Sequence, residues 1–110
     1  MTDANDVLKK RILSQFQVSE EDLIKLCQAM GVKSLAIFGS ALQGNFKPGQ
    51  SDIDFLVEFE LVSIDCFFDF LEGLKRLFHY TDIDLVTRGS LKNQVIREEI
   101  LSSKKDLYAA

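Results

Sequence analysis

The sequence has few of the residues from which many metal sites and membrane anchors are built. His79 is the only histidine, which excludes a zinc site made of several histidines. Cys27 and Cys66 lack metal-type spacing and lie in apolar helical patterns, so we expect reduced thiols in a core. The chain has no uninterrupted apolar run near the ~20 residues of a membrane span. Residues 1–6 are acidic and do not resemble a signal peptide, and we expect a cytoplasmic protein.

Positive charge is also in short supply. Thirteen Lys and Arg face 17 Asp and Glu, for a net charge of −4. This balance argues against direct nucleic-acid binding, which needs clustered cations to displace counterions. The 110 residues are 46% hydrophobic and include nine Phe. A chain of this size can bury about two-thirds of its unfolded surface, so we expect one folded domain over residues 1–110.

Hydrophobic spacing predicts an α/β fold with a short mixed sheet of about three strands and flanking helices. We expect strands at 32–38, 52–59 and 84–87, one helical turn at 41–44, and a loop at 45–51 that holds the only proline. The expected helices have these capping candidates: Asn5 and Asp6 for the first, Ser19 for the second, Ser63 for the third over 64–78, and Ser90 for the last.

The most informative segment contains a Gly-Ser pair, a polar loop and two aspartates one residue apart. Alternate side chains of a strand share a face, so Asp52 and Asp54 point the same way. Paired carboxylates repel unless a cation neutralises them, and hard oxygen ligands suit Mg²⁺ with a bound phosphate. The alternative is an acidic strand edge that serves solubility. Gly39 and Ser40 follow an apolar strand, where backbone N–H groups and a hydroxyl can receive phosphate oxygens, although an ordinary turn and helix cap would look the same.

A third carboxylate repeats the pattern thirty residues later. The run Thr81 to Thr87 again reads acid, apolar, acid, apolar. If this strand lies beside the first acidic strand, Asp84 faces the same cleft and completes a metal shell or orients an attacking hydroxyl. The alternative is that Asp82 and Asp84 only mark a strand entrance. Asp82 comes earlier on the strand, and we expect it to be solvated.

These motifs resemble the nucleotidyltransferase superfamily that includes DNA polymerase beta, and most closely its minimal nucleotidyltransferase (MNT) domains. The resemblance covers about residues 32–86. It implies an enzyme that binds Mg²⁺ and ATP, with Asp52, Asp54 and Asp84 as catalytic and metal-binding residues and Gly39 and Ser40 as nucleotide-binding residues. It also implies a HEPN-domain partner, a toxic ribonuclease to which the MNT antitoxin transfers AMP, on a tyrosine hydroxyl. The chain is too short for a separate acceptor domain, so a partner must supply the acceptor or a homodimer must complete the pocket.

Two departures from the family pattern support an alternative function. Ala41 and Gln43 stand where the family usually has arginine, and the segment between Ser40 and Asp52 is one residue longer than usual. Lys47 or Arg88 are the candidate replacements for the lost cations. The alternative is a weak or inactive MNT-like protein that neutralises its partner by binding alone. The three retained carboxylates favour the enzyme.

The third predicted helix has an unusually broad apolar face. Beside a main stripe that includes Leu74 and Phe78, a second stripe contains Cys66, Phe70 and Leu77. Broad apolar surfaces often mark interfaces, so the second stripe predicts an exposed partner-binding patch with Phe70 as its anchor, with core packing as the alternative.

Overall fold

A computed structural model describes residues 4–61 and 63–110 and has a four-stranded mixed sheet in the order β3-β2-β1-β4. The strands are β1 (Val32–Phe38), β2 (Ile53–Phe59), β3 (Ile83–Thr87) and β4 (Lys105–Ala109). The helices are α1 (Ala4–Gln15), α2 (Glu20–Ala29), α3 (Ser40–Gln43), α4 (Ile64–Phe78), the short η1 (Arg88–Ser90) and α5 (Gln94–Ser103). The β1 strand is antiparallel to both β2 and β4, whereas β2 and β3 run parallel with α4 as their crossover.

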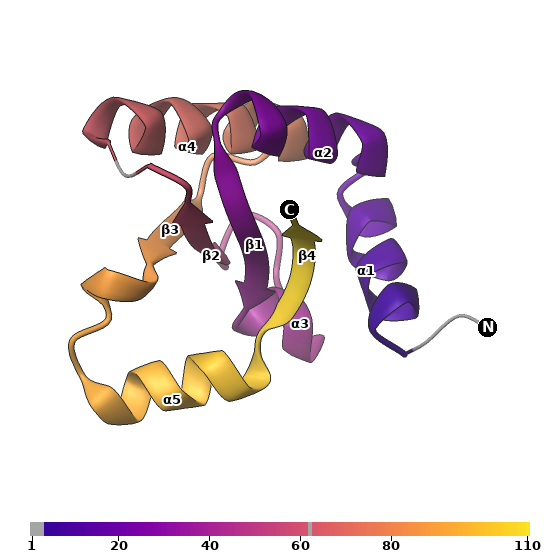
Figure 1. Ribbon diagram of the computed structural model, residues 1–110. Helices are drawn as coiled ribbons and strands as arrows, with labels where there is room; N and C mark the ends of the chain where they lie inside the picture. Colours follow the sequence, from indigo (N-terminus) through magenta and orange to yellow (C-terminus); the bar gives the residue numbers. More distant parts are fainter. Residues whose placement is uncertain (1–3, 62) are drawn as a thin grey trace.

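The helices are divided between the two sides of the sheet. Figure 1 shows α2 and α4 across one side, with α1 beyond them, and α5 on the opposite side. Side chains alternate along β2, so its odd-numbered residues face α4 and its even-numbered residues face the other way. We call this second side the open face; the register places Ala36, Phe38, Asp54, Leu56 and Asp84 on it. No helix in the described part of the chain is long and apolar enough to cross a membrane.

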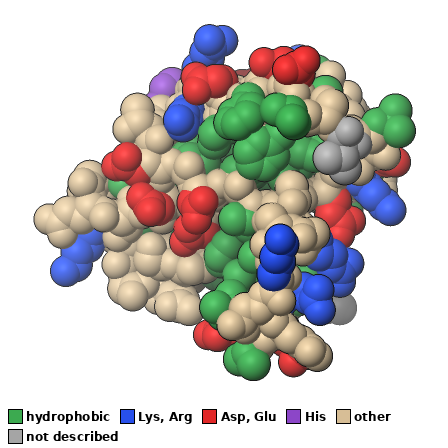
Figure 2. Space-filling model, turned by 90° about the vertical axis from the view of Figure 1, so that its left-hand side faces the viewer, with side chains coloured by type: hydrophobic (Ala, Val, Ile, Leu, Met, Phe, Trp, Pro, Cys, Tyr) green, Lys and Arg blue, Asp and Glu red, His purple; other side chains and the backbone are tan. Residues whose placement is uncertain are grey.

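The exposed part of α4 differs from our prediction. Phe70 was expected at the surface but is 0% exposed, because it packs edge-on against Phe59 of β2. Leu77 is half-buried against the same core. The exposed apolar residues of α4 lie instead near its N-terminus, where Ile64 is 76% and Phe68 57% exposed. Figure 2 shows hydrophobic side chains gathered in one patch of this side of the molecule.

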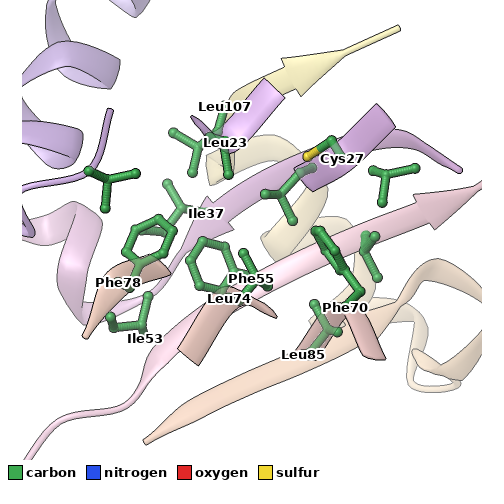
Figure 3. Packing of buried hydrophobic residues seen from close by; sticks show 14 of the residues in the cluster. Leu23, Cys27, Ile37, Ile53, Phe55, Phe70, Leu74, Phe78, Leu85 and Leu107 are labelled. Carbon is green, nitrogen blue, oxygen red and sulfur yellow. The ribbon is translucent and has the colours of Figure 1, made fainter. Parts of the chain in front are cut away.

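The core lies between the sheet and helices α1, α2 and α4. Its largest fully buried side chains include Phe55, Phe70, Phe78, Ile37 and Leu107 (Figure 3). The aromatic rings of Phe55 and Phe78 meet edge to face at 5.1 Å, a favourable geometry for paired rings. Core positions therefore come from α1, α2, α4 and all four strands, and they fix α4 over β2.

The capping residues of the helices can be compared with those predicted from the sequence. Ser19 and Ser63 cap α2 and α4 as predicted, accepting hydrogen bonds from the N–H groups of Asp22 and Cys66. The prediction for the last helix is wrong, because Asn93 caps α5 and the Ser90 hydroxyl instead donates to the Thr87 carbonyl. In α1 the prediction is also wrong: positions 5 and 6 lie inside the helix, and the residues before Ala4 are outside the described range.

The fourth strand was missed by the sequence analysis, which expected three. β4 begins with Lys105 and Asp106, and Leu107 is its single buried residue. Such a short, charged run has little strand signal of its own. It is a strand because β1 offers it an unpaired edge, and charges are typical of edge strands.

Candidate active site

The two strands that carry the aspartates lie side by side and bring the carboxylates of Asp54 and Asp84 to the open face. Asp54 is the second residue of β2, and Asp52 lies just before the strand, where its charge acts on Asp54. The parallel register pairs Asp54 with Asp84 of β3. Asp54 is half-buried, whereas Asp52 and Asp84 are exposed. Asp82, as expected, is exposed at the entrance to β3.

The carboxyl group of Asp54 is perturbed by its surroundings at this point of the sheet. Burial raises the pKa of Asp54, and the charges of Asp84 and Asp52 raise it further, to about 6. Near neutral pH the half-buried Asp54 therefore carries a negative charge that both its burial and its acidic neighbours disfavour. A cation would relieve that repulsion, so the chemistry of this site suits a metal ion.

The donor set suits an ion that shares its ligands with a substrate. Among residues 4–61 and 63–110, no group of three Asp, Glu, His or Cys side chains is placed to hold a metal by itself. Mg²⁺ is commonly bound through one or two carboxylates, waters and substrate phosphates. Asp52 and Asp54 could supply the two carboxylates, and Asp84 as a third ligand stays a prediction.

Gly39 is placed where a side chain could not be accommodated. Its φ of 79° and ψ of −151° lie in a region that is essentially restricted to glycine. A Cβ atom at this position would clash with Oδ2 of Asp54 and lie 3.3 Å from Cγ of the same side chain. The cause is the register, since Phe38 pairs with Asp54 and Gly39 follows directly. The Gly-Ser turn and the acidic strand are thus in contact.

Ser40 begins α3, the short helix that was expected as a turn. The Gly39 carbonyl accepts hydrogen bonds from the N–H groups of Leu42 and Gln43, at 3.1 and 3.2 Å. The first N–H groups of a helix have no partner within it, so those of Ser40 and Ala41 need an acceptor outside α3. Ala41, at one of the two family arginine positions, is buried in the core, whereas Gln43 is exposed.

The loop before Asp52 is held by a residue that the sequence analysis did not identify. The Tyr80 hydroxyl accepts a hydrogen bond from the Gly49 N–H at 3.0 Å and donates one to the Ser51 carbonyl at 2.5 Å. The Tyr80 ring packs against Phe16 and Phe46. Tyr80 lies between the end of α4 and the start of β3, so it joins both acidic strand entrances. In the sequence, only its position four residues before Asp84 associates Tyr80 with the site.

The two candidate replacement cations lie at different places. Arg88 follows β3 and pairs with Glu58 at 3.3 Å, and Glu58 is four residues beyond Asp54 along β2. At about 3.3 Å per residue, Arg88 is therefore about 13 Å from the level of the carboxylates. Lys47 is exposed in the loop between α3 and β2. Arg88 is thus far from the turn at Gly39, and Lys47 stays a prediction.

Comparison with known proteins points to one family. The model of the nucleotidyltransferase domain matches residues 20–107. A putative protein adenylyltransferase of Methanocaldococcus jannaschii is 43% identical over 70 residues, which are 63% of this chain and 69% of that protein. The protein adenylyltransferase MntA of Thermococcus cleftensis is 35% identical over 74 residues, which are 66% and 73% of the two chains.

Solved structures with the same fold include toxin–antitoxin complexes. One complex with AMP-PNP aligns with a TM-score of 0.64 and 23% identity, covering 84% of this chain and 75% of that one. A tri-AMPylated Shewanella oneidensis HEPN toxin in complex with MNT antitoxin aligns with a TM-score of 0.54 and 20% identity, covering 83% and 70%. The four-stranded sheet, the Gly-Ser turn against Asp54 and the matched residues 20–107 lead to one assignment: this chain belongs to the nucleotidyltransferase domain family.

Proposed function

We propose that the chain is a Mg²⁺-dependent protein adenylyltransferase that transfers AMP from ATP to a tyrosine of a HEPN-domain toxin and so acts as its antitoxin. The observation that carries this proposal is the pairing of Asp54 with Asp84 in register, against the glycine turn at Gly39. The names of the curated relatives and of the toxin–antitoxin structures support the same reaction.

In the proposed reaction, the tyrosine oxygen attacks the α-phosphorus of ATP. The new oxygen–phosphorus bond forms as the bond to the β-phosphate bridging oxygen breaks, and pyrophosphate leaves. Asp84 is exposed and lies level with Asp54, so it can accept the proton of the hydroxyl. Gly39 and Ser40 receive the outer phosphates through backbone N–H groups and a hydroxyl. The metal ion would neutralise charge on the transferring phosphate, held by Asp52 and Asp54.

The carboxylates also bear on the competing function, which is neutralisation of a partner by binding alone. The uncharged Ala41 and Gln43 favour that alternative. However, burial and the charges of Asp84 and Asp52 raise the pKa of Asp54, so its ionised carboxylate is disfavoured without a cation. A domain that only covers its partner has no need of such a cluster, which is why we prefer the enzyme.

The apolar patch at the start of α4 is the surface that we assign to the partner. Leu61 is 85% exposed, and Ile64 and Phe68 rim a hollow of about 340 Å³ floored in part by Leu85 of β3. Large exposed side chains around a hollow are typical of protein interfaces. A second copy of the chain is the other occupant to consider, and light scattering of the purified protein separates the two.

The test is the transfer of labelled AMP to a purified HEPN-domain partner. Wild-type protein with Mg²⁺ and ATP labelled in the α-phosphate should label the partner, and replacing the acceptor tyrosine by phenylalanine should remove the label. Asp54→Asn should reduce transfer by at least about 10²-fold. Asp82→Asn is the matched control, because it makes the same charge change at an exposed position of the adjacent strand entrance. Full neutralisation of the toxin without any transfer would favour the binding alternative.

A further inference from the structure

The strand β3 forms one edge of the sheet, and in the described part of the chain β2 is its one neighbouring strand. Figure 1 shows this edge below the start of α4. An edge strand turns a row of backbone N–H and C=O groups outward, and these groups can pair with another chain. An extended segment of a second protein can therefore add to the sheet at β3.

One hydrogen bond shows which backbone groups of β3 point outward. The Ile53 N–H donates to the Asp82 carbonyl at 2.9 Å, so the backbone groups of Asp82 point toward β2. Both backbone groups of a strand residue point to the same side, and successive residues alternate. Val86 therefore also pairs with β2, whereas the N–H and C=O groups of Leu85 and the N–H group of Thr87 point outward.

The apolar hollow at the start of α4 lies directly beside this edge. Leu85 and Thr87 line it together with Ile64, Phe67 and Phe68 of α4. Residues opposite each other on paired strands point to the same face of a sheet, so a residue added opposite Leu85 directs its side chain into the hollow. With a volume of about 340 Å³ and a mainly apolar lining, the hollow suits an apolar side chain at that position.

The next residue of an added strand points to the open face. Antiparallel pairs are more common than parallel pairs and slightly more stable per residue, so we expect the added strand to run antiparallel to β3. The next residue then lies opposite Asp84, with the two Cβ atoms about 5 Å apart. The Asp84 side chain is exposed and level with Asp54. A hydroxyl group on the added residue is thus brought next to the carboxylates.

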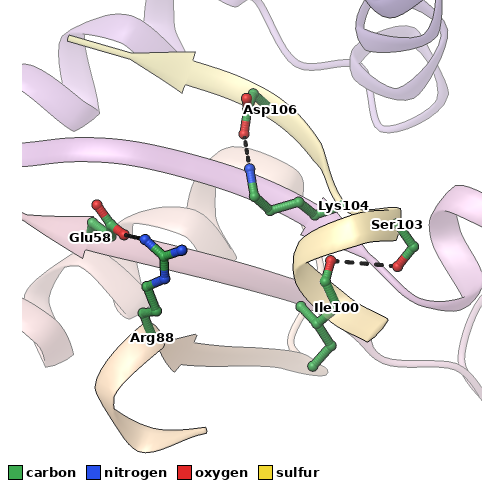
Figure 4. Close-up of polar contacts among 6 residues, drawn as sticks. All are labelled: Glu58, Arg88, Ile100, Ser103, Lys104 and Asp106. Atoms are coloured by element: carbon green, nitrogen blue, oxygen red, sulfur yellow. Dashed lines mark hydrogen bonds and ion pairs between the residues drawn. The ribbon is translucent and has the colours of Figure 1, made fainter. Parts of the chain in front are cut away.

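The surroundings of this edge are acidic. Residues 48–74 contain seven Asp and Glu and no Lys or Arg. Asp65 and Asp69 of α4 are exposed, and each directly follows an exposed apolar residue of the patch. Figure 2 shows acidic side chains beside that patch. Arg88 at the end of β3 is already paired with Glu58 (Figure 4). Such a surface repels a second copy of this acidic chain and attracts a basic segment.

We propose that β3 is the docking strand for an extended basic segment of the partner. The segment pairs antiparallel with β3, places an apolar side chain in the hollow and presents the next side chain to Asp84. This inference rests on the proposed function for the identity of the partner and for the hydroxyl on that next side chain. Main-chain hydrogen bonds supply affinity in such strand addition, and the pockets for alternate side chains supply specificity.

Amide hydrogen exchange tests the pairing directly. Isotope-labelled protein is measured by NMR alone and with the purified HEPN-domain partner. We expect exchange at Leu85 and Thr87 to slow at least tenfold in the complex, because their N–H groups become hydrogen-bonded. Val86 is the internal control, since its N–H already pairs with β2. Partner binding without slower exchange at Leu85 and Thr87 overturns the proposal. Slow exchange at both residues in the free protein, with dimers in light scattering, also overturns it.

A substitution at Thr87 tests the same edge by affinity. Thr87→Pro removes an outward N–H group, which an edge strand tolerates where that group faces solvent. Thr87→Val is the matched control, because it changes the same side chain and keeps the N–H. We expect Thr87→Pro to bind the partner at least tenfold more weakly than Thr87→Val, with equal Mg–ATP thermal shifts. Equal affinities overturn the proposal, and amide exchange in the wild-type complex decides should the proline variant fold poorly.

The charge of the segment has a test of its own. Asp69→Lys should weaken partner binding at least tenfold, whereas Glu98→Lys, at an exposed position of α5, should not. Equal affinities of these two variants overturn the basic character of the segment. Slower exchange at Leu85 in a complex that shows no AMP transfer supports the docking strand and counts against the proposed function. AMP transfer in a complex with unchanged exchange at Leu85 does the reverse.

Discussion

Replacing Gly39 by alanine tests the contact on which the active-site geometry depends. Two effects add at this position. The backbone at φ 79° and ψ −151° lies in a region that costs a non-glycine residue about 1–3 kcal/mol. The added Cβ also meets Oδ2 of Asp54, so either the carboxylate or the turn must move.

Gly44→Ala is the matched control for the backbone effect. Gly44 also has a positive φ, of 82°, but nothing lies within 4 Å of a Cβ at that position. Alanine in the left-handed conformation costs about 1–2 kcal/mol. We therefore expect Gly39→Ala to lower the free energy of unfolding by at least about 1 kcal/mol more than Gly44→Ala. In a domain of this size, that difference corresponds to about 4–8 °C in Tm.

The assay combines urea unfolding with a ligand-induced thermal shift. Mg²⁺ and ATP should raise the Tm of wild type and of Gly44→Ala by mass action, as a ligand at 100 times its Kd stabilises by about 2.7 kcal/mol. Gly39→Ala should lose that shift because its Asp54 carboxylate is displaced. Equal destabilisation of the two variants together with equal Mg–ATP shifts would refute the claim that the turn and the acidic strand are in close contact.

Three further predictions use other parts of the fold. Phe70→Ala should destabilise the free protein by about 3–5 kcal/mol, and a stable Phe70→Ala protein in urea unfolding would contradict the burial of Phe70. Phe68→Ala should lower the free energy of unfolding by less than about 1 kcal/mol yet weaken partner binding at least tenfold. Asp54→Asn should stabilise the metal-free protein by about 1 kcal/mol above pH 6, after allowance for partial exposure. The sign follows from a pKa of about 6 for Asp54 in the folded protein against 3.8 in the unfolded chain, because the wild-type protein then loses stability as the pH rises from about 4 to about 6. The gain from Asp54→Asn should therefore vanish near pH 4. A constant gain in Tm across that range would contradict the prediction. Tyr80→Phe removes two hydrogen bonds but keeps the ring, so it should weaken the apparent Mg²⁺ affinity several-fold while Tyr108→Phe in β4 does not; a Mg²⁺ titration with identical midpoints would show that the loop is held by other contacts.

Much of the sheet and the site follow from local patterns. Alternation alone predicts that Asp52 and Asp54 share a face; in the structure Asp52 lies just before β2, and its charge acts on Asp54. The thirty-residue echo predicted a neighbouring acidic strand, and the register pairs Asp54 with Asp84. These predictions worked because the period of a strand is set by the backbone and needs no knowledge of distant residues.

The features that were missed depend on contacts between distant residues. β4 is a strand because β1 lies beside it, and Tyr80 holds the loop because its hydroxyl meets Gly49 and Ser51, about thirty residues away. For α4, the sequence shows two apolar stripes but not which one meets the sheet. Phe70 was assigned to the wrong side for that reason. Gly39 was predicted as a phosphate-binding residue, but its contact with Asp54 depends on the register of β1 against β2, which the sequence does not show.

The parallel pairing of β2 and β3 separates two properties of the protein. Hydrogen bonds between the strands keep Asp54 level with Asp84, and α4 connects them on the far side of the sheet. The exposed residues at the start of α4, such as Ile64 and Phe68, take no part in that ladder. Under the proposed assignment of this patch to the partner, substitutions at these positions change the protein that is recognised without altering the spacing of the acids. Such a chain can follow a changing partner through evolution while its chemistry stays the same.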